Sequence, residues 1–475
     1  MTANTPMTFD LKNVLNQYQG QAQALHEKYV NTVFAHVLDM IGFAHEYTEG
    51  KGCYLTTRDG RTIFDGLSGY GVFGMGRNHP TVIQAIEQAL ALDLPNLVQM
   101  DTFLLSGLLA ERLIRIAPGN RLQHVFFTNS GTEAAEGAIK FARAATGRPR
   151  ILFSQGAFHG LTTGALALNG DASFREGFGD LLPGTEAVDW TQLEALEYEL
   201  KKKNVAAVVL EPIRGKGVYY PPDDRVYPTL QRLCRENGTL FIVDEIQSGL
   251  GRTGRWWACQ HWDLEPDILL CAKALSGGLV PIGAILYSDA VYRGVFSRLD
   301  RCVVHSSTFG QNALAMVAGL AALHVLEEEN LVERSARQGD RLLAGLRELQ
   351  KRHELLHEIR GKGLMVGVEF GPPKSLRLKP AWTLLHTAQN GLFAQAVVMR
   401  LYQTHHILTQ VAGHHQEVVK FLPPFIITDE EVDRLVSALD EVLQECSRFP
   451  GPVWSVGKQL AGAAVRQHLF GRESS

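Results

Sequence analysis

Short apolar runs, most of them separated by helix-like segments, fill residues 120 to 290 and constrain the fold more than any other feature of the sequence. The runs are VFFTNS (125–130), RILFS (150–154), VAAVVLEP (205–212), TLFIVDE (239–245), DILLCAK (267–273) and PIGAILY (281–287). Continuous apolar runs of this length are typical of strands buried on both faces, and the segments between them supply covering helices. We therefore expect an α/β fold with a mostly parallel central sheet.

The length of the chain, 475 residues, exceeds what one ordinary hydrophobic core supports. The order of the patterns predicts an N-terminal arm with part of a small domain over residues 1–75, and a large α/β domain over 76–335. Residues 336–475 would complete the small domain and add a helical tail, so both chain ends would build one smaller α+β domain. Within these parts, YLTTRDGRTIFDGL (54–67) is typical of a hairpin, and the pattern over 311–352 is helical.

Composition excludes several classes of protein. Hydrophobic residues make up 45% of the chain and charged residues 20%, a balance that excludes a disordered or fibrous chain, and the net charge of -4 argues against nucleic-acid partners. The six cysteines are scattered without CxxC or Cys/His spacing, so we expect reduced thiols and no metal site. The first residues, MTANTPMTFDLKN, lack the apolar core of a signal peptide, and no apolar stretch approaches the ~20 residues of a membrane span. We expect a cytoplasmic protein whose partners are small molecules and copies of itself.

Polar side chains follow four of the apolar runs at the point where each run ends. Asn129 and Ser130 follow the first run, and Glu211, Asp244 and Lys273 end three later ones. In open α/β sheets the ligand crevice lies beyond the carboxyl ends of the strands. We therefore expect these side chains to converge on one crevice.

Lys273 is the most unusual of these residues, because an ammonium group is costly beside a buried strand. A lysine in such a crevice loses hydration, which lowers its pKa and frees the amine to attack a carbonyl, as Schiff-base chemistry requires. The alternative is that Lys273 begins the next loop and reaches solvent, which is the commoner case for a lone strand-end lysine.

Two neighbouring features favour the chemical interpretation. A carboxylate at the position of Asp244 can pair with the ring nitrogen of pyridoxal phosphate and keep it protonated, although an isolated aspartate is more often a helix cap or part of an ion pair. Ser130, Gly131 and Thr132 lie between a strand and a helix, where free N–H groups and the helix dipole favour an anion such as a phosphate. Any capped strand-to-helix turn looks similar, so it is the combination with Lys273 that indicates this cofactor.

Several segments occur together in a characteristic order along the chain. They are SGTEAAEGAIKFAR, FHG, EPI, VDEIQSGLGRTG, DILLCAKALSGG, PIGA and HSSTFGQN. With this set, the sequence resembles the class III pyridoxal-phosphate aminotransferases over about residues 45–445, a family that includes ornithine, acetylornithine, 4-aminobutyrate and putrescine aminotransferases. The resemblance implies a fold-type I homodimer with active sites at the subunit interface.

The resemblance also implies roles for individual residues. Lys273 would form the Schiff base with pyridoxal 5'-phosphate and move the substrate proton, and Asp244 would contact the pyridinium nitrogen. The remaining cofactor contacts would come from Ser130, Gly131, Thr132, Phe158, His159 and Gln247, and from Thr308 of the partner subunit. His159 equally fits a packing role beside the ring.

The predicted substrate residues are Tyr70, Glu211 and Lys420. Many family members carry an arginine before the PP pair and bind a substrate carboxylate with it, whereas VVKFLPPFII places Lys420 there. Because lysine offers a point charge instead of a two-donor fork, recognition of an ordinary α-amino acid is in question. Lys420 either pairs with Glu211 or meets a phosphate or a hydroxylated substrate, and Tyr70 is either a substrate contact or a packed loop aromatic.

We expect an aminotransferase that moves an amino group between a primary amine or ω-amino compound and a carbonyl or keto-acid acceptor by a ping-pong mechanism. One alternative is a phospholyase acting on a phosphorylated amino alcohol, because such members of the family resemble this sequence at Lys420. Another is a non-catalytic binding protein on the same scaffold, against which the joint presence of Lys273, Asp244 and the anion-binding turn argues.

A further alternative comes from AWTLLHTAQNGLFAQAVVMRLY (381–402). Its apolar residues recur at helical spacing, at Trp382, Leu385, Leu392, Ala396 and Met399. This spacing most often indicates a helix facing the core. The other interpretation is an apolar wall for a bulky lipophilic aldehyde, since aminotransferases of hopanoid side-chain maturation look similar here. The tail over 453–470 would extend that surface or dock on the dimer.

Overall fold

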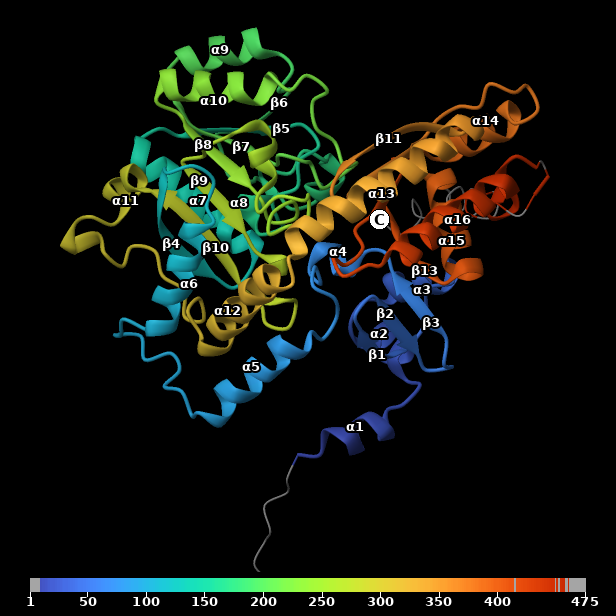
Figure 1. The fold of residues 1–475 in the computed structure, drawn as a ribbon. Helices are drawn as coiled ribbons and strands as arrows, with labels where there is room; N and C mark the ends of the chain where they lie inside the picture. The colour runs from blue at the N-terminus through green and yellow to red at the C-terminus, as the bar shows by residue number, and fades with distance from the viewer. Residues whose placement is uncertain (1–8, 414–415, 449, 452, 458–459, 461–475) are drawn as a thin grey trace, which may run out of the picture.

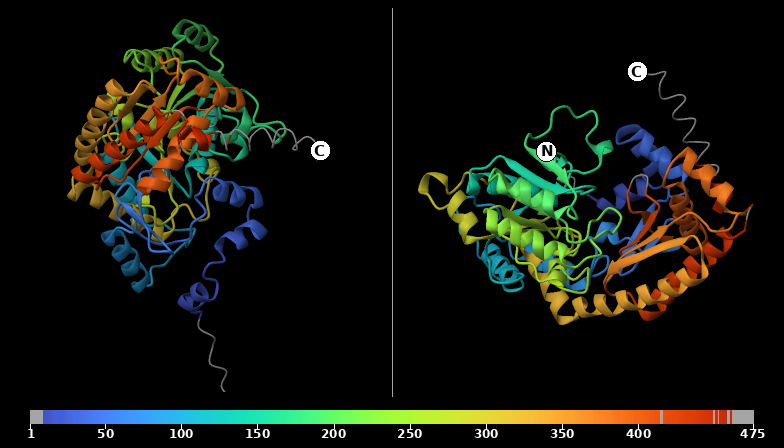
Figure 2. Two further views of the ribbon diagram at one scale, coloured as in Figure 1. Left: turned by 90° about the vertical axis from the view of Figure 1, so that its right-hand side faces the viewer. Right: turned by 90° about the horizontal axis from the view of Figure 1, so that it is seen from above.

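The computed structural model describes residues 9–413, 416–448, 450–451, 453–457 and 460. Two groups of elements stand apart in Figures 1 and 2, and the long helix α13 (Leu331–Arg352) passes from one group to the other. We call the group around the seven-stranded sheet the large domain, and the group around two four-stranded sheets the small domain.

The large domain is built on a seven-stranded sheet in the order β4-β10-β9-β8-β7-β5-β6. Its strands are β4 (Leu122–Thr128), β5 (Arg150–Ser154), β6 (Thr185–Val188), β7 (Val205–Leu210), β8 (Leu240–Asp244), β9 (Ile268–Cys271) and β10 (Gly283–Ser288). All of them run parallel except β10, which lies antiparallel between β4 and β9. The predicted α/β class with a mostly parallel central sheet is confirmed.

Helices cover both faces of this sheet. They are α5 (Pro80–Ala91), α6 (Leu104–Arg115), α7 (Gly131–Thr146), α8 (Thr163–Leu166), α9 (Leu193–Lys201), α10 (Val226–Asn237), α11 (Asp289–Val295) and α12 (Ala313–Glu328). Every residue of β7 is buried: Ala206 and Val209 pack in the cluster that holds α7, while Val208 and Leu210 pack in the larger core. A strand covered on both faces has a continuous apolar sequence, which is why the sequence pattern predicted β7 as a buried strand.

The small domain contains two four-stranded sheets. The first is β1 (Tyr47–Lys51), β2 (Tyr54–Thr57), β3 (Thr62–Asp65) and β13 (Ile407–Leu408), and the second is β11 (Leu356–Lys362), β12 (Met365–Phe370), β15 (Val418–Phe421) and β14 (Gln410–Val411). The predicted hairpin over 54–67 is the antiparallel pair β2 and β3. Because β13 pairs with β3, this sheet joins residues from both chain ends, as predicted. Helix α16 (Asp429–Cys446), which begins at a capping box, packs against α13.

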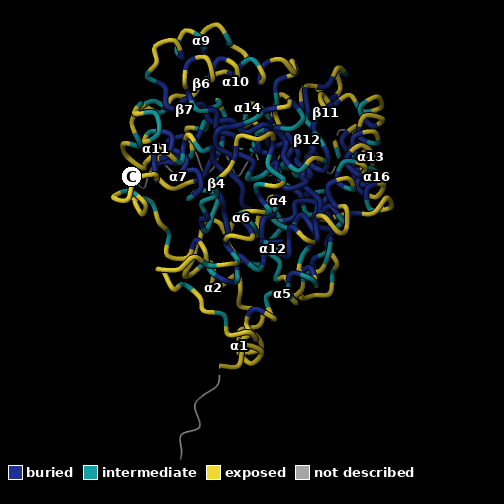
Figure 3. Tube along the Cα trace, turned by 60° about the vertical axis from the view of Figure 1, so that its left-hand side comes forward, coloured by how far each residue is buried: buried dark blue, intermediate teal, exposed yellow. Residues whose placement is uncertain are grey.

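From residue 9 onward, the described N-terminal segment forms three short helices before the first strand. They are α1 (Leu11–Gln17), α2 (Ala22–Tyr29) and α3 (Thr32–Met40). Every residue of α1 is exposed, and this helix stands out as an exposed tube at one end of the molecule in Figure 3. Within the described residues, no helix has the length and apolar character needed to cross a membrane.

The segment over 381–402 is two helices instead of the single helix that its spacing suggested. Helix α14 (Lys379–Ala388) is capped at its C-terminal end by Gln389, and α15 (Leu392–His405) begins after Gly391. Gly391 has φ 88°, a left-handed conformation that glycine adopts without steric cost, so the chain turns here. Most of the predicted tail, from residue 461 onward, lies outside the described residues.

Candidate active site

A cavity of about 1080 Å³ lies beyond the carboxyl ends of β4, β7, β8 and β9. The side chains predicted to converge there do line it together, namely Asn129, Ser130, Glu211, Asp244 and Lys273. The small domain supplies the facing wall from α15, β14 and β15. Six strands run in one direction, so their carboxyl ends meet at one edge of the sheet, and this geometry brings distant residues together.

Lys273 follows β9 and begins the short 3-10 helix η3 (Lys273–Ser276). Its backbone has φ 47°, a left-handed conformation that costs energy for a residue with a side chain and that is concentrated at functional sites. Burial lowers the pKa of the Lys273 ammonium, and the negative charges of Asp244 and Glu211 offset only part of this effect. An amine with a lowered pKa is a better nucleophile near neutral pH, because more of it is unprotonated.

Asp244, the last residue of β8, is held on both carboxylate oxygens. His159 donates from Nδ1 to one oxygen at 2.7 Å, and the Ile246 N–H donates to the other at 3.0 Å. Burial opposes the charged form of His159, but the hydrogen bond and charge of Asp244 outweigh it and raise the pKa of the imidazole. The Nε2 atom of His159 is buried with no hydrogen-bond partner among the described residues.

The turn between β4 and α7 provides an anion-binding geometry. Ser130 is the N-cap of α7, a 16-residue helix, and its hydroxyl accepts from the Glu133 N–H at 3.3 Å. The N–H groups of Gly131 and Thr132 lie in the first turn of the helix, where they have no partner within it. Both residues line the cavity, so the positive end of the helix dipole faces this space.

Glu211, which also lines the cavity, accepts hydrogen bonds from two backbone groups. One of its oxygens accepts from the Phe158 N–H at 2.9 Å and the other from the Gly215 N–H at 2.7 Å, and burial raises the pKa of this carboxyl. Among the described residues no ion pair joins Glu211 to Lys420, and the Lys420 ammonium donates to the carbonyl of Gly215. The backbone of Gly215 instead lies between the two side chains.

Lys420, on β15, is buried and reaches the cavity wall from the small domain. Its Nζ atom donates to the carbonyl of Gly215 at 3.0 Å and to Oε1 of Gln247 at 3.5 Å. Gln247 in turn donates to the carbonyl of Tyr70 at 3.1 Å, which connects the predicted substrate residues. Burial, with a further contribution from the charge of Lys273, lowers the pKa of Lys420 to about 8.

Thr308 is the one predicted cofactor residue that does not line this cavity. It is exposed on the segment between β10 and α12, and its carbonyl accepts from the side chain of Gln99 at 3.3 Å. Within a single chain it therefore lies apart from the other predicted contacts.

The structure adds a cavity residue that the sequence analysis did not identify. Lys216 pairs with Asp171 at 3.0 Å, and its ammonium lies 4.0 Å from the ring centroid of Phe174. Lys216 and Phe174 both line the cavity, next to Phe158. The only local signal was a lysine two residues beyond Arg214 in EPIRGKG, which does not reveal a partner 45 residues away in the chain.

Of the two interpretations of the segment over 381–402, its burial fits the core-facing one better than the apolar wall. Trp382, Leu385, Ala396 and Met399 are buried in the hydrophobic core, and of the five apolar residues only Leu392 lines the cavity. The other cavity-lining residues of this segment are Gln389, Asn390, Gly391 and Gln395. The break between α14 and α15 thus brings amide side chains to the site.

Comparisons with known proteins agree with this arrangement. The family described as aminotransferase class-III matches residues 39–443. Aminotransferase PigE of a Serratia species is 34% identical over 455 residues, covering 89% of this chain and 53% of PigE, so this chain spans about half the length of that relative. Putrescine aminotransferase of Pectobacterium atrosepticum is 37% identical over 401 residues, or 82% of this chain and 80% of the relative. The solved ornithine aminotransferase of Toxoplasma gondii, with partial occupancy of PLP, superposes with a TM-score of 0.79 at 28% identity, covering 93% of this chain and 100% of that one.

Proposed function

Because the chain belongs to the class III aminotransferases, we propose that it transfers an amino group from a primary amine or ω-amino compound to a carbonyl or keto-acid acceptor. The observation that carries this proposal is the convergence of Lys273, Asp244 and the anion-binding turn on one cavity. Donor and acceptor would use the same cavity in turn, which gives ping-pong kinetics.

The donor groups around the cavity fit pyridoxal 5'-phosphate. The N–H groups of Gly131 and Thr132 with the Ser130 hydroxyl would hold its phosphate, and Lys273 would hold its aldehyde carbon. Asp244 would face the ring nitrogen, Phe158 and His159 would border the ring, and Gln247 would lie near the ring hydroxyl. The buried Nε2 of His159, which lacks a partner among the described residues, is consistent with a polar group that a ligand satisfies.

When bound, this cofactor supplies an aldehyde that condenses with primary amines and a ring that accepts the electron pair of a carbon losing its proton. The protein's own contribution is to hold charges and to move one proton. Burial lowers the pKa of Lys273 and so favours its unprotonated amine, and this Nζ atom would take the proton from the carbon that bears the donor amine. Asp244 would be held in place by His159 and the Ile246 N–H, which both donate to it.

We also propose that the active protein is a homodimer in which Thr308 contributes to the partner's phosphate site. Thr308 is exposed, and the neighbouring Phe309 and Met100 are exposed large apolar side chains, 57% and 95% accessible. A surface of this kind fits burial by a second copy. All six cysteines are free, which supports the proposed cytoplasmic location. The domain division at residues 75 and 335 is likewise proposed.

A phospholyase is the second candidate, and Lys420 is the residue that favours it, because a buried ammonium also fits the phosphate of a phosphorylated amino alcohol. The two activities differ in what they consume. A transaminase needs a carbonyl acceptor to turn over, whereas an elimination releases inorganic phosphate without one.

A two-step assay separates these activities. Purified protein carrying the cofactor is mixed with a primary amine alone, and the absorbance of the bound cofactor is expected to change once and stop. Addition of a keto acid should restore the original spectrum and release the aminated acceptor. A matched reaction with O-phosphoethanolamine serves as the comparison, and steady phosphate release in the absence of acceptor would refute the transaminase proposal.

The pH dependence of acceptor binding tests the role of Lys420. The lysine carries its positive charge below pH about 8 and loses it above, so attraction for an acceptor carboxylate is present at lower pH and lost at higher pH. We expect the KM of a keto acid to rise by about tenfold per pH unit once the pH exceeds that value. Lys420→Arg should show a flat KM over the same range, because a guanidinium stays charged, and should use α-amino acids better. An equal rise in both proteins would exclude Lys420 as the carboxylate contact.

A further inference from the structure

A row of four residues crosses the second sheet of the small domain. Arg360 of β11 pairs with Gly367 of β12, Gly367 pairs with Lys420 of β15, and Lys420 pairs with Gln410 of β14. Residues paired across antiparallel strands project to the same face of a sheet. Arg360, Lys420 and Gln410 therefore extend toward one side, with Gly367 leaving a gap between the two cations.

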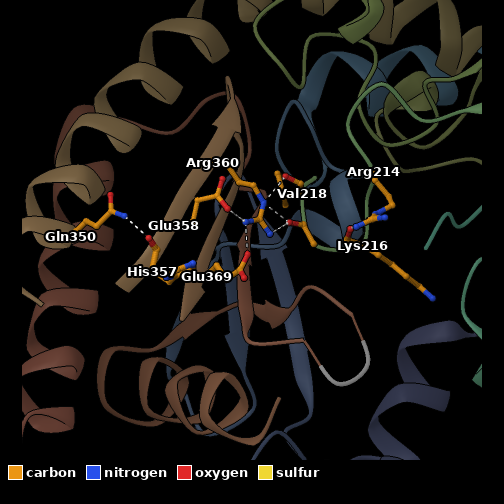
Figure 4. Close-up of polar contacts among 9 residues, drawn as sticks. Arg214, Lys216, Val218, Gln350, His357, Glu358, Arg360 and Glu369 are labelled. Carbon is orange, nitrogen blue, oxygen red and sulfur yellow. Dashed lines mark hydrogen bonds and ion pairs between the residues drawn. The ribbon is translucent and has the colours of Figure 1, made fainter. Parts of the chain in front are cut away.

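The segment over 214–218, which we call the active-site turn, lies against this row. Arg360 donates to the carbonyl of Gly217 from Nε at 3.0 Å and from Nη2 at 2.8 Å, and from Nε to the carbonyl of Val218 at 3.1 Å. Figure 4 shows Arg360 reaching across from its strand to Val218. The next position in the row is Gly367, and Val218 packs against its backbone. A Cβ atom on residue 367 would lie 2.9 Å from Cβ of Val218, so only glycine leaves room for this contact.

Lys420 contacts the same turn one step further along the row, through the carbonyl of Gly215 at 3.0 Å. The N–H of Gly215 donates to Glu211 at 2.7 Å, so this one residue links two of the three predicted substrate side chains, Glu211 and Lys420. Lys216, the next residue, lines the cavity. The active-site turn thus contains one charged residue of the cavity, Lys216, and hydrogen-bonds two others, Glu211 and Lys420.

The guanidinium of Arg360 is itself fixed from the other side. It donates to Glu358 at 2.8 Å and to Glu369, and only 10% of its side chain is exposed. Three hydrogen bonds to backbone carbonyls and contacts with two carboxylates hold the guanidinium in a single orientation. A planar guanidinium with several donors can make all of these contacts at once, whereas a lysine ammonium cannot. Arg360 does not line the cavity, so any effect on substrates must pass through the turn.

We propose that Arg360 is a positioning residue for substrate recognition: it seats the active-site turn on the small-domain sheet and thereby fixes the Gly215 carbonyl that orients the Lys420 ammonium. The proposal rests on the function of Lys420 proposed above. A turn that lifts off the sheet deprives Lys420 of its 3.0 Å acceptor, and the ammonium then no longer holds one position for an acceptor carboxylate. The anion-binding turn and Lys273 belong to the large domain and keep their places.

The test compares Arg360→Gln, Arg360→Lys and Gly367→Ala with Arg400→Gln. Arg400 makes a bidentate pair with Glu445 between α15 and α16 and does not line the cavity, so it controls for general loss of small-domain stability. For Arg360→Gln and Gly367→Ala we expect the KM of a keto acid to rise about tenfold, with the rate of the donor half-reaction within about twofold of wild type. The KM of Arg360→Lys should lie between those of wild type and Arg360→Gln. Arg400→Gln should leave the KM unchanged.

Hydrogen exchange gives a readout that does not depend on activity. In Arg360→Gln the N–H of Gly215 is expected to exchange faster than in wild type, whereas the N–H groups of β7 keep their protection. If Arg360→Gln leaves both the exchange rate at Gly215 and the KM unchanged, the proposal is wrong. It is also wrong if the variant lowers the rates of the donor and acceptor half-reactions equally. A wild-type protein that transfers no amino group refutes the proposed function instead, and the exchange at Gly215 alone then decides whether Arg360 seats the turn.

Discussion

Replacing Lys273 with alanine is expected to abolish amino transfer while leaving the fold intact. The side chain, which lies just beyond the end of β9, would supply both the nucleophile that holds the cofactor and the base that moves the substrate proton. Proton transfer by a positioned group typically contributes 10²–10⁴-fold, so we expect kcat to fall by about 10⁴-fold or more. The measurement is turnover of an amine and keto acid by cofactor-loaded protein.

The stability of this variant provides its control. Burial lowers the pKa of Lys273, which means that the folded protein holds this ammonium at a cost, and alanine removes that cost. The thermal midpoint without cofactor should therefore match wild type or exceed it. Lys202→Ala, at an exposed site between α9 and the start of β7, at the opposite end of that strand from Glu211, should retain full activity. Wild-type turnover in Lys273→Ala would refute the mechanism, and loss of activity through unfolding would appear as a lowered midpoint.

The strand-end residues could be predicted from the sequence because two simple regularities determine them. A run such as AAVVL is apolar throughout only when both faces are covered, and a polar residue at its end marks the sheet edge. Glu211, Asp244 and Lys273 were found in this way, and they line one cavity. An apolar run does not indicate the direction of its strand in the sheet, so the antiparallel orientation of β10 could not be predicted from PIGAILY.

Contacts that depend on pairing between distant segments could not be predicted. The row from Arg360 to Lys420 exists because β11, β12 and β15 pair in one register, and no local pattern specifies that register. The pair of Lys216 with Asp171 has the same origin. The break at Gly391 was different, because QNG inside a helical pattern is a recognised turn signal that the apolar spacing on either side outweighed.

Asp244→Asn is expected to lower the rate of both half-reactions by about 10²–10³-fold, the usual effect of removing one preorganised electrostatic contact. The amide keeps the shape of the carboxylate but not its charge, so it cannot hold a proton on a facing ring nitrogen. It also withdraws the interactions that raise the pKa of His159, and burial should then bring that pKa below its ordinary value.

The measurements are single-turnover rates with donor and with acceptor, and the titration of His159 followed by NMR. Asp267→Asn is the matched control, because Asp267 is also a buried carboxylate that accepts a backbone N–H, from Phe241 at 2.9 Å, but it lies before β9, at the opposite end of the strand from Lys273. That variant should lose stability and keep its chemistry per folded molecule. If Asp244→Asn and Asp267→Asn reduced the rates equally, the carboxylate of Asp244 would be a structural group, and its position opposite Lys273 would have no chemical consequence.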